Sequence, residues 1–439
     1  MRKLGGVRAP HNKNTADKQP VAMPVPPEVV IPMAMHIGAP AKPAVAVGDA
    51  VKVGQIIGEA QGFVSSPVHS SVSGTVKGIQ EITGVTGAKT MAVRIAADGE
   101  QTVFEGISKP SVSNVDEFLA AVRDSGSVGL GGAGFPTAVK LKVGESLDYL
   151  IVNGAECEPY VTSDTRTMTD DAEYVWKGVL LLKEYIRPEN IVIGIEANKP
   201  GPIGKMRELS AGAEGVVVKT LPSKYPQGGE KVLIYSVTGR IVPEGKLPLD
   251  VGVVVINCTT LAHIAKYFET GMPLVTKCVT VDGTAVSSPN NVIAPIGTPV
   301  SALFDFCGGF KEEPKKILLG GPMMGIAIPD TDMPVTKTTN AALAFEKKAA
   351  AVPEESACIH CGRCAMSCPM GLMPLDVDTA YKLNKPERLE SLKANLCMEC
   401  GCCAFSCPAF RPLTQVMKLS KQALNEYLKA KPKGGAATA

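Results

Sequence analysis

Two cysteine runs near the carboxyl end decide the fold of this chain: CIHCGRCAMSCP at residues 358–369 and CMECGCCAFSCP at residues 397–408. Both have the spacing C-x2-C-x2-C-x3-C-P, in which three closely spaced thiolates bind one 4Fe–4S cluster and the fourth reaches a second cluster. We therefore predict two adjacent clusters, which indicate a chain that conducts single electrons. The first cysteine set is Cys358, Cys361, Cys364 and Cys407, and the second is Cys397, Cys400, Cys403 and Cys368.

Other uses of these cysteines fit the spacing less well. Zinc favours thiolates in separated pairs, and disulfides need an oxidising compartment. Cys402 is surplus, and we expect a free thiol that points away from the cluster. His360, between two ligands, is expected to be solvated or to contact a ligand. Four scattered cysteines are predicted to be ordinary buried thiols: Cys157, Cys258, Cys278 and Cys307.

Length and composition limit the possible classes of protein. The chain has 439 residues, enough for three or four domains, and its 44 Gly and 34 Pro predict many turns. A net charge of +2 gives no support for nucleic-acid binding. No apolar run reaches the roughly 20 residues that span a bilayer, and the start lacks the apolar core of a signal peptide. No Ser–His–acid arrangement supports a hydrolase.

The order of predicted elements indicates a multidomain α+β protein. Short alternating runs separated by Gly turns predict a first β domain, and strands that alternate with helices then predict an α/β layer with a mainly parallel sheet. The expected order is an extended arm (1–28), a β domain (29–112), an α/β domain (113–271), a β-grasp domain (272–330), a linker (331–356), the cluster domain (357–412), and a helix with a flexible tail (413–439).

A glycine-rich segment, GLGGAGFP at residues 129–136, is the first candidate site outside the cysteines. It satisfies G-x-G-x-x-G but follows a helix, whereas the Rossmann fingerprint follows a strand. Its backbone amides and the positive end of a helix that begins near Pro136 can hold an anion, and Lys140 can add a charge. A plain glycine turn is the alternative. The candidate glycines are Gly129, Gly131, Gly132 and Gly134.

Polar residues follow two predicted strands, where α/β sheets bind ligands. After the strand at 149–154, Asn153 can pair with the edge of a heterocycle, and Glu156 and Glu158 can accept hydrogen bonds from ribose or amide groups. A polar loop that caps a helix is the alternative. At the end of another strand, Asn257 and Thr260 could reach the same crevice.

A third loop, YPQGGEK at residues 225–231, precedes a predicted helix. Its amides, at the helix N-terminus, can hold a phosphate or a dinucleotide. A plain loop and helix start is an equally good interpretation. The residues of interest are Gly228, Gly229 and Glu230.

Several stretches together resemble a known family. GLGGAGFPTAVK (129–140), NGAECEPYVTSD (153–164), YPQGGEK (225–231) and N-x-x-T-L-A from Asn257 are similar to the flavin-binding subunit of respiratory complex I. The resemblance is closer to the RnfC family of the Rnf electron-transport complexes. The stretch PEVVIPMAMHIGAPAKPAVAVGDAVKVGQIIGEA, the segment PVHSSVSGTV (67–76), NGAECEPY and the paired cysteine runs carry this closer likeness, which covers nearly the whole chain.

The resemblance implies a role for each candidate site. Gly129, Gly131, Gly132, Gly134 and Lys140 correspond to the loop that holds the FMN phosphate. Asn153, Glu156 and Glu158 match flavin and nicotinamide contacts, Gly228, Gly229 and Glu230 the nucleotide loop, and Asn257 and Thr260 further flavin contacts. Complex I has an Arg before its Gly pair, where this chain has Leu130, and its flavin-binding subunit holds one cluster with different cysteine spacing.

The resemblance also implies a fold and an activity. The expected parts are a barrel-sandwich (lipoyl-like) domain, a Rossmann-like FMN/NADH domain, an SLBB-like β-grasp domain and a ferredoxin-like domain with two 4Fe–4S clusters. The tip of the lipoyl-like segment, residues 62–65, has no Lys, so we expect a packing or docking domain and not a swinging arm.

The implied activity is that of a peripheral NADH-side subunit at the cytoplasmic face of the cell membrane. It would exchange hydride between NAD(H) and FMN and relay electrons to integral-membrane and iron–sulfur partner subunits, with ferredoxin as an indirect partner. Two alternatives are a soluble flavin and iron–sulfur cobalamin reductase of a bacterial microcompartment, and a flavin-free two-cluster electron carrier.

Overall fold

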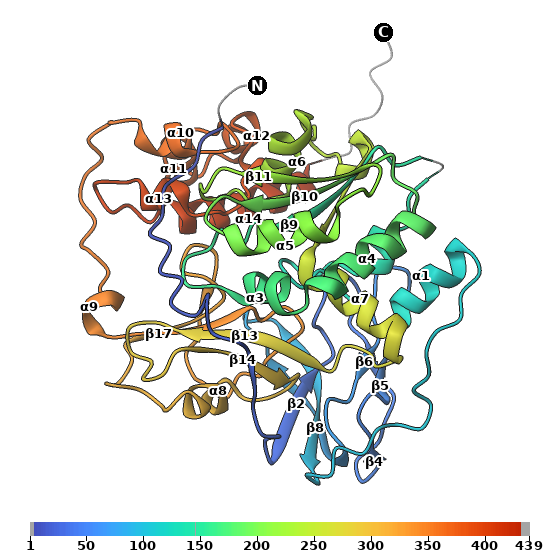
Figure 1. Ribbon diagram of the computed structural model, residues 1–439. Coiled ribbons are helices and arrows are strands. Elements are labelled where there is room, and N and C mark those ends of the chain that lie inside the picture. Colours follow the sequence, from blue (N-terminus) through green and yellow to red (C-terminus); the bar gives the residue numbers. More distant parts are fainter. Residues whose placement is uncertain (1–3, 145, 432–439) are drawn as a thin grey trace.

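The α/β domain is built on a four-stranded parallel sheet. The computed structural model describes residues 4–144 and 146–431, and Figure 1 shows their arrangement. The elements of this domain are α1 (Val115–Asp124), α2 (Thr137–Lys140), β9 (Tyr149–Gly154), α3 (Ser163–Asp170), α4 (Ala172–Tyr185), β10 (Asn190–Glu196), α5 (Pro200–Leu209), β11 (Val216–Leu221), α6 (Glu230–Thr238), the 3-10 turn η1 (Pro248–Val251), β12 (Val253–Asn257) and α7 (Cys258–Thr270).

The strand order of this sheet creates a crevice for a ligand. The order is β11-β10-β9-β12, and all neighbours are parallel. The chain therefore moves in one direction from β9 to β11 and then crosses back to β12 on the other side of β9. Ligands bind outside the carboxyl ends of the strands where the order reverses. Here that point lies between β9 and β12, whose last paired residues are Asn153 and Asn257.

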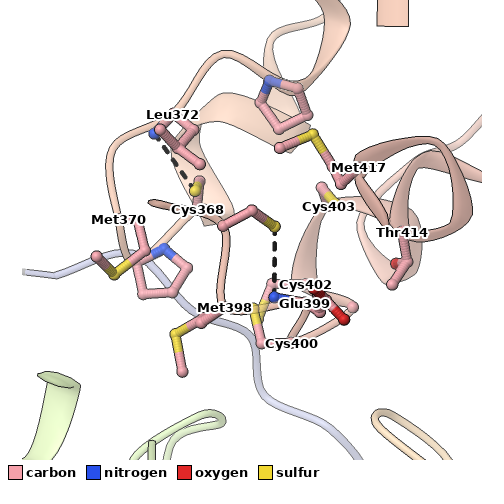
Figure 2. Close-up of a pocket in the computed structure, with 14 residues that line it drawn as sticks. Cys368, Met370, Leu372, Met398, Glu399, Cys400, Cys402, Cys403, Thr414 and Met417 are labelled. Carbon is pink, nitrogen blue, oxygen red and sulfur yellow. Dashed lines mark hydrogen bonds between the residues drawn. The ribbon is translucent and has the colours of Figure 1, made fainter. Parts of the chain in front are cut away.

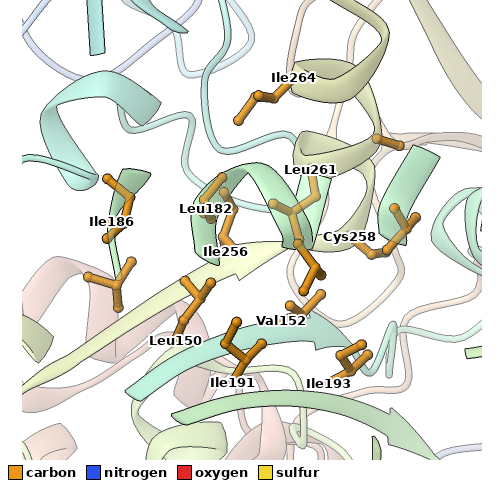
Figure 3. Close-up of a cluster of buried hydrophobic side chains, with 14 of the residues drawn as sticks. Leu150, Val152, Leu182, Ile186, Ile191, Ile193, Ile256, Cys258, Leu261 and Ile264 are labelled. Atoms are coloured by element: carbon orange, nitrogen blue, oxygen red, sulfur yellow. The ribbon is translucent and has the colours of Figure 1, made fainter. Parts of the chain in front are cut away.

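Alternate residues of each strand cover the two faces of the sheet. Leu150, Val152 and Ile256 pack against α4 and α7, and Figure 3 shows this core with the helices on one side of the strands. Ile151 and Val255 point to the opposite face, towards α6. Burial on both faces explains the nearly continuous apolar runs of these strands.

The barrel domain packs against the glycine segment. Its core contains Ile31 and Ile57 together with Val128 and Leu130 of the α/β domain. The tip at residues 62–65 lies on α1, where Arg123 Nη2 donates to Gly62 O at 2.9 Å. Two sheets, β2-β8-β7-β4 and β3-β5-β6, form the domain. The strands are β2 (Glu28–Pro32), β3 (Lys42–Pro43), β4 (Ala50–Val51), β5 (Ile56–Glu59), β6 (Val68–His69), β7 (Gly74–Thr83) and β8 (Lys89–Ala97).

A six-stranded sheet, in the order β1-β14-β13-β17-β15-β16, forms the next domain. The segment 331–356, expected to be a linker, supplies β17 to the middle of this sheet, between β13 and β15. The arm at residues 1–28 supplies the edge strand β1, parallel to β14. The elements are β1 (Val21–Ala22), β13 (Thr276–Asp282), β14 (Asn290–Pro295), α8 (Val300–Phe306), β15 (Lys316–Leu319), β16 (Ile326–Ala327) and β17 (Ala341–Phe345).

The cysteine domain consists of two similar halves. In each half a left-handed residue (His360 or Glu399) precedes the second cysteine, and a left-handed glycine (Gly362 or Gly401) begins a short helix. The helices are α9 (Lys347–Ala350), α10 (Arg363–Ser367), α11 (Pro374–Lys382), α12 (Pro386–Ser391), the 3-10 turn η2 (Ala394–Leu396), α13 (Cys402–Phe405) and α14 (Leu413–Ala430). Residues 432–439 of the expected flexible tail lie outside the described residues.

The amino-terminal arm crosses every domain. Leu4 O accepts from Lys224 Nζ at 2.7 Å, and Val7 and Tyr225 exchange backbone hydrogen bonds. Figure 1 shows the arm running from the cysteine domain, past the α/β domain, to the six-stranded sheet. Among residues 4–144 and 146–431, no helix combines the length and apolar character that crossing a membrane requires.

Candidate functional site

Asn153 and Asn257 stand side by side at the point where the strand order reverses. Asn153 Nδ2 donates to Gly228 O at 2.9 Å, so it holds the loop at 225–231 against β9. Asn257 Oδ1 accepts from the backbone amides of Thr259 and Thr260 at 2.9 and 3.2 Å and caps α7. Strand ends, a helix N-terminus and a loop therefore meet at one crevice, as the sequence predicts.

The glycine segment lies over this crevice. Leu130 N donates to Thr260 Oγ1 at 3.0 Å. A Cβ on Gly131 would lie 2.2 Å from Asn257 Nδ2, so only glycine allows this close approach. Gly129 is half-buried, Gly134 is buried, and Gly131 and Gly132 are exposed, which leaves the tip of the segment open to a ligand. The segment can thus present its backbone to an anion.

Lys140 differs from the expectation that it supplies a free charge beside the glycines. Its Nζ lies 2.7 Å from Glu230 Oε1 and 2.9 Å from Val255 O. Two residues predicted for separate loops, Lys140 and Glu230, are therefore joined as a half-exposed ion pair. In this arrangement each neutralises the other.

Glu156 and Glu158 are both bound to protein groups. The Glu156 carboxylate accepts from Asp164 N at 2.6 Å, Thr165 N at 3.1 Å and Thr165 Oγ1 at 2.5 Å, so it caps α3 from a distance in sequence. Glu158 Oε2 accepts from Met323 N at 3.0 Å, which ties the loop to the six-stranded sheet. Burial raises the pKa of both carboxyls.

Two lysines that the sequence analysis did not single out hold this loop. Lys13 Nζ donates to the carbonyl oxygens of Glu156, Glu158 and Val161 at 2.9, 2.8 and 2.5 Å. Lys199 Nζ donates to Ala155 O at 2.6 Å. Their acceptors are backbone oxygens of residues far away in the chain, so no local sequence signal identifies them.

The second cysteine set surrounds a cavity. Cys368, Cys397, Cys400 and Cys403 line it together with Met398 and Met417, and Figure 2 shows their side chains around one space. Cys402, expected to point away, also lines the cavity, and its Sγ lies 3.9 Å from Tyr225 O. Four thiols from two distant segments, in largely apolar surroundings, fit the ligand set of a 4Fe–4S cluster.

Backbone amides point at the sulfur atoms in both halves. Glu399 N lies 3.3 Å from Cys397 Sγ, and His360 N lies 3.4 Å from Cys358 Sγ at the equivalent position. Leu372 N adds a 3.4 Å contact to Cys368 Sγ, drawn in Figure 2. Such hydrogen bonds stabilise charge on sulfur and adjust cluster potentials. The left-handed conformation of His360 and Glu399 accompanies these contacts.

Burial makes the free thiols of the second set reluctant to ionise. It raises the pKa of Cys397 to about 11 and that of Cys403 to about 12. The hydrogen bond with Cys402 lowers the pKa of Cys400 to about 7. Because metal binding requires thiolates, it must release protons here. Across the described residues, no three His, Cys, Asp or Glu are arranged to hold one metal ion.

The first cysteine set lies closer to the surface. Cys361 is exposed, and Cys358, Cys364 and Cys407 are half-buried. Burial, with a smaller contribution from charge on Cys407, raises the pKa of Cys364. His360, between two of these cysteines, is exposed, in agreement with its expected solvation.

The four cysteines outside the motifs are free thiols. Cys258 and Cys307 are buried, whereas Cys157 and Cys278 are half-buried. Cys157 Sγ accepts from Gly228 N at 3.3 Å, and burial raises its pKa to about 12. These thiols are therefore protonated packing groups near neutral pH.

The loop at 225–231 connects the crevice with the second cysteine set. Gly228 bonds Asn153 on one side, while a Cβ on Gly229 would lie 2.3 Å from Met398 Cε on the other. Tyr225 belongs to the same buried cluster as Cys400 and Cys402. The two candidate sites are therefore neighbours across a single loop.

Four domain families match the chain in the expected order, which confirms the predicted fold class. They are the RnfC barrel sandwich hybrid domain (residues 1–100), the Nuo51 FMN-binding domain (122–266), the SLBB domain (278–327) and the 4Fe-4S dicluster domain (357–410). The second of these contains every candidate glycine, Asn and Glu of the crevice, and the last contains all eight cluster cysteines. FMN and two 4Fe–4S clusters are thus the cofactors of the matched domains.

A solved structure shares the fold. An NAD+-reducing [NiFe]-hydrogenase in its air-oxidised state matches with a TM-score of 0.53 at 20% identity, covering 72% of this chain and 64% of the hydrogenase chain. Its H2-reduced state gives the same TM-score at 19% identity, covering 75% and 70% of the two chains.

Curated relatives, all of the RnfC type, extend over most of the chain. The relative from the Na+-translocating ferredoxin:NAD+ oxidoreductase complex of Acetobacterium woodii is 43% identical over 96% of both chains. The relative from the proton-translocating complex of Clostridium ljungdahlii is 43% identical over 84% of this chain and 82% of its own length. The relative from the ion-translocating oxidoreductase complex of Citrobacter koseri is 38% identical over 84% of this chain, which spans about half (53%) of that longer protein. Each relative is one subunit of a larger complex. The chain therefore belongs to the RnfC family, whose members are subunits of the ion-translocating ferredoxin:NAD+ oxidoreductase complexes.

Proposed function

We propose that this chain exchanges a hydride between NAD(H) and FMN and passes single electrons between the flavin and partner subunits through two 4Fe–4S clusters. The cofactors supply the redox chemistry, and the protein supplies binding, orientation and electrostatics. The observation that carries the proposal is the loop at 225–231. It contacts the strand-end crevice through Gly228 and the second cysteine set through Gly229 and Tyr225.

The crevice residues divide into those that face a ligand and those that shape the site. The glycine segment and the helix end after Pro136 are proposed to hold the FMN phosphate, because the exposed tip offers backbone amides. Asn153, Asn257 and Thr260 fix the strand ends and the glycine segment beside it. Glu156, Glu158 and the Lys140–Glu230 pair support the loops, and Gly228 and Gly229 complete the nucleotide side.

The two cysteine sets are proposed to serve different sides of the molecule. The second set, in its cavity beside Met398 and Tyr225, serves the flavin side. The first set, with Cys361 exposed and flanked by the exposed Ile359 and Met366, serves the partner side. Each set combines three cysteines of one run with the last cysteine of the other.

The partners and location follow from the family. We propose that integral-membrane and iron–sulfur subunits of the same complex receive or supply the electrons, with ferredoxin as the distant donor. The chain itself would lie at the cytoplasmic face of the membrane. Ion translocation would belong to the membrane subunits.

Anaerobic purification with iron, sulfide and flavin analysis tests this proposal. We expect about eight irons and one FMN per chain, and bleaching of the flavin absorbance when NADH is added. Cys403→Ser and Cys364→Ser should each remove one of two cubane signals from the EPR spectrum of the reduced protein. Cys307→Ser, which changes a buried thiol outside the motifs, should keep both signals.

Two outcomes would contradict the proposal. About four irons per chain, or two undiminished cubane signals in either motif variant, would exclude the ligand sets. Full iron content without any flavin, or no response to NADH, would reduce the chain to a two-cluster carrier.

A further inference from the structure

Three lysines are buried among the described residues, and one of them lacks acceptors. Lys199, Lys277 and Lys337 are 5%, 3% and 0% exposed. Lys337 Nζ donates to Pro67 O, Gly126 O and Ser66 Oγ, and Lys199 also has several acceptors. Lys277 Nζ makes a single hydrogen bond, to Leu130 O at 3.3 Å.

This difference points to a missing partner. An ammonium group has three N–H donors, and a buried charge without partners is costly. Unsatisfied buried groups therefore mark places where a ligand or ion belongs. The other two lysines show that the same chain satisfies a buried ammonium where the role is structural.

The nearest acid does not fill the gap. Asp164 is a source of favourable charge for Lys277 but forms no direct ion pair with it among the described residues. Both Asp164 oxygens are already used, by Asn257 Nδ2 at 2.7 Å and Thr259 Oγ1 at 2.6 Å. Burial lowers the pKa of Lys277, and Asp164 opposes that shift.

The position of Lys277 indicates what the ligand is. Its only acceptor among the described residues is a backbone oxygen inside the glycine segment, and Leu130 N on the same residue is fixed by Thr260. The segment carries no cationic side chain of its own, and Lys140 is occupied by Glu230 and Val255 O. An anion at the glycine segment would therefore find one uncommitted buried ammonium beside it, supplied by β13 of the neighbouring domain.

We propose that Lys277 binds the phosphate group that the glycine segment holds, and that this phosphate is that of FMN. The assignment rests on the proposed function. It makes the SLBB domain part of the flavin site, because Lys277 lies on β13. The phosphates of a dinucleotide share this chemistry, and the experiment separates the two sources.

Flavin titrations of the full chain, depleted of flavin and carrying its clusters, test the assignment. The wild type should bind FMN more tightly than riboflavin, which lacks the phosphate. Lys277→Met should weaken FMN binding roughly 10- to 100-fold and leave riboflavin binding nearly unchanged, as expected for loss of one charged hydrogen bond. Lys277→Gln, which keeps a donor for Leu130 O, should lose the same preference.

Lys337→Met is the matched control, since it removes a buried lysine whose acceptors are complete. It should lower stability and leave the ratio of FMN to riboflavin affinity unchanged. Equal weakening of both flavins by the Lys277 variants would show a purely structural role and overturn the assignment. An unchanged FMN preference with a raised KM for NADH would assign Lys277 to the dinucleotide. A wild type that binds neither flavin would instead contradict the proposed function itself.

Discussion

At the scale of single residues, the site depends on close approach more than on charge. Gly131 lets the glycine segment approach Asn257, which in turn bonds Asp164. Neither Gly131 nor Gly132 has a positive φ, so the backbone at both positions accepts alanine. The two glycines therefore separate the effect of space from that of backbone freedom.

Gly131→Ala should destabilise the flavin-free protein by roughly 1–3 kcal/mol, because the added methyl overlaps Asn257 Nδ2 and forces the side chain to move. Gly132→Ala is the control, since its Cβ would meet nothing within 4 Å. Urea unfolding followed by circular dichroism measures both. Equal stabilities of the two variants would show that the segment adjusts freely.

The sequence predicted residues whose chemistry is written in local spacing, and it missed those whose role depends on distant partners. The eight cluster cysteines follow from two runs of twelve residues. The pairing of Lys140 with Glu230 does not, because 90 residues separate them. Lys277 did leave a signal: it shares one face of β13 with Val279 and Val281, where an apolar residue is expected.

At the scale of elements, the helices differ in where their caps come from. α1 is capped locally, because Asn114 Oδ1 accepts from Glu117 N and Glu117 Oε2 accepts from Ser113 N. That pattern could be predicted from the sequence. α3 was not predicted as a separate helix, since its N-terminus is capped by the carboxylate of Glu156 from the preceding loop.

Removing the two caps should have different consequences. Glu156→Ala should lower the free energy of unfolding by roughly 1–3 kcal/mol, because it leaves partly buried donors of Asp164 and Thr165 without an acceptor. It should also weaken FMN binding, since Asp164 holds Asn257. Asn114→Ala should cost about 1 kcal/mol and leave flavin affinity unchanged. If both variants kept full flavin affinity, the cap of α3 would have no link to the crevice.

At the scale of the whole molecule, three domains meet around buried basic groups. Lys337 precedes β17 of the six-stranded sheet and bonds Pro67 O of the barrel domain and Gly126 O of the α/β domain. His69 and His263 lie in the same junction, and burial lowers their pKa values to about 3 and about 4. Sequence patterns place each residue in a strand, helix or loop but cannot show that they converge.

This junction predicts a loss of stability in mild acid. Both histidines are neutral in the folded state down to about pH 4, whereas in the unfolded chain they take up protons below about pH 6.5. The unfolded state therefore binds more protons in this range, and the free energy of unfolding falls as pH falls. The slope should reach about 1.4 kcal/mol per pH unit for each histidine.

His69→Gln isolates one of the two contributions, since it keeps a polar side chain that does not titrate. Urea unfolding at pH 7, 6 and 5 should show a shallower decline than in the wild type. Burial lowers the pKa of Lys337 to about 7, so Lys337 affects the slope mainly at higher pH. The same slope in variant and wild type would mean that His69 is hydrated and titrates normally.

The course of the amino-terminal arm has a consequence for biosynthesis. A Cβ on Gly5 would touch Cys368 O, Leu4 bonds Lys224, and β1 completes its ladder on β14. Ribosomes deliver the first of these partners hundreds of codons before the last, and domains generally fold as they emerge. The opening residues must therefore wait, unattached, until translation of the cysteine-rich end is almost finished. Maturation of the iron sites and fastening of this strap are then late, neighbouring events in the life of each newly made copy.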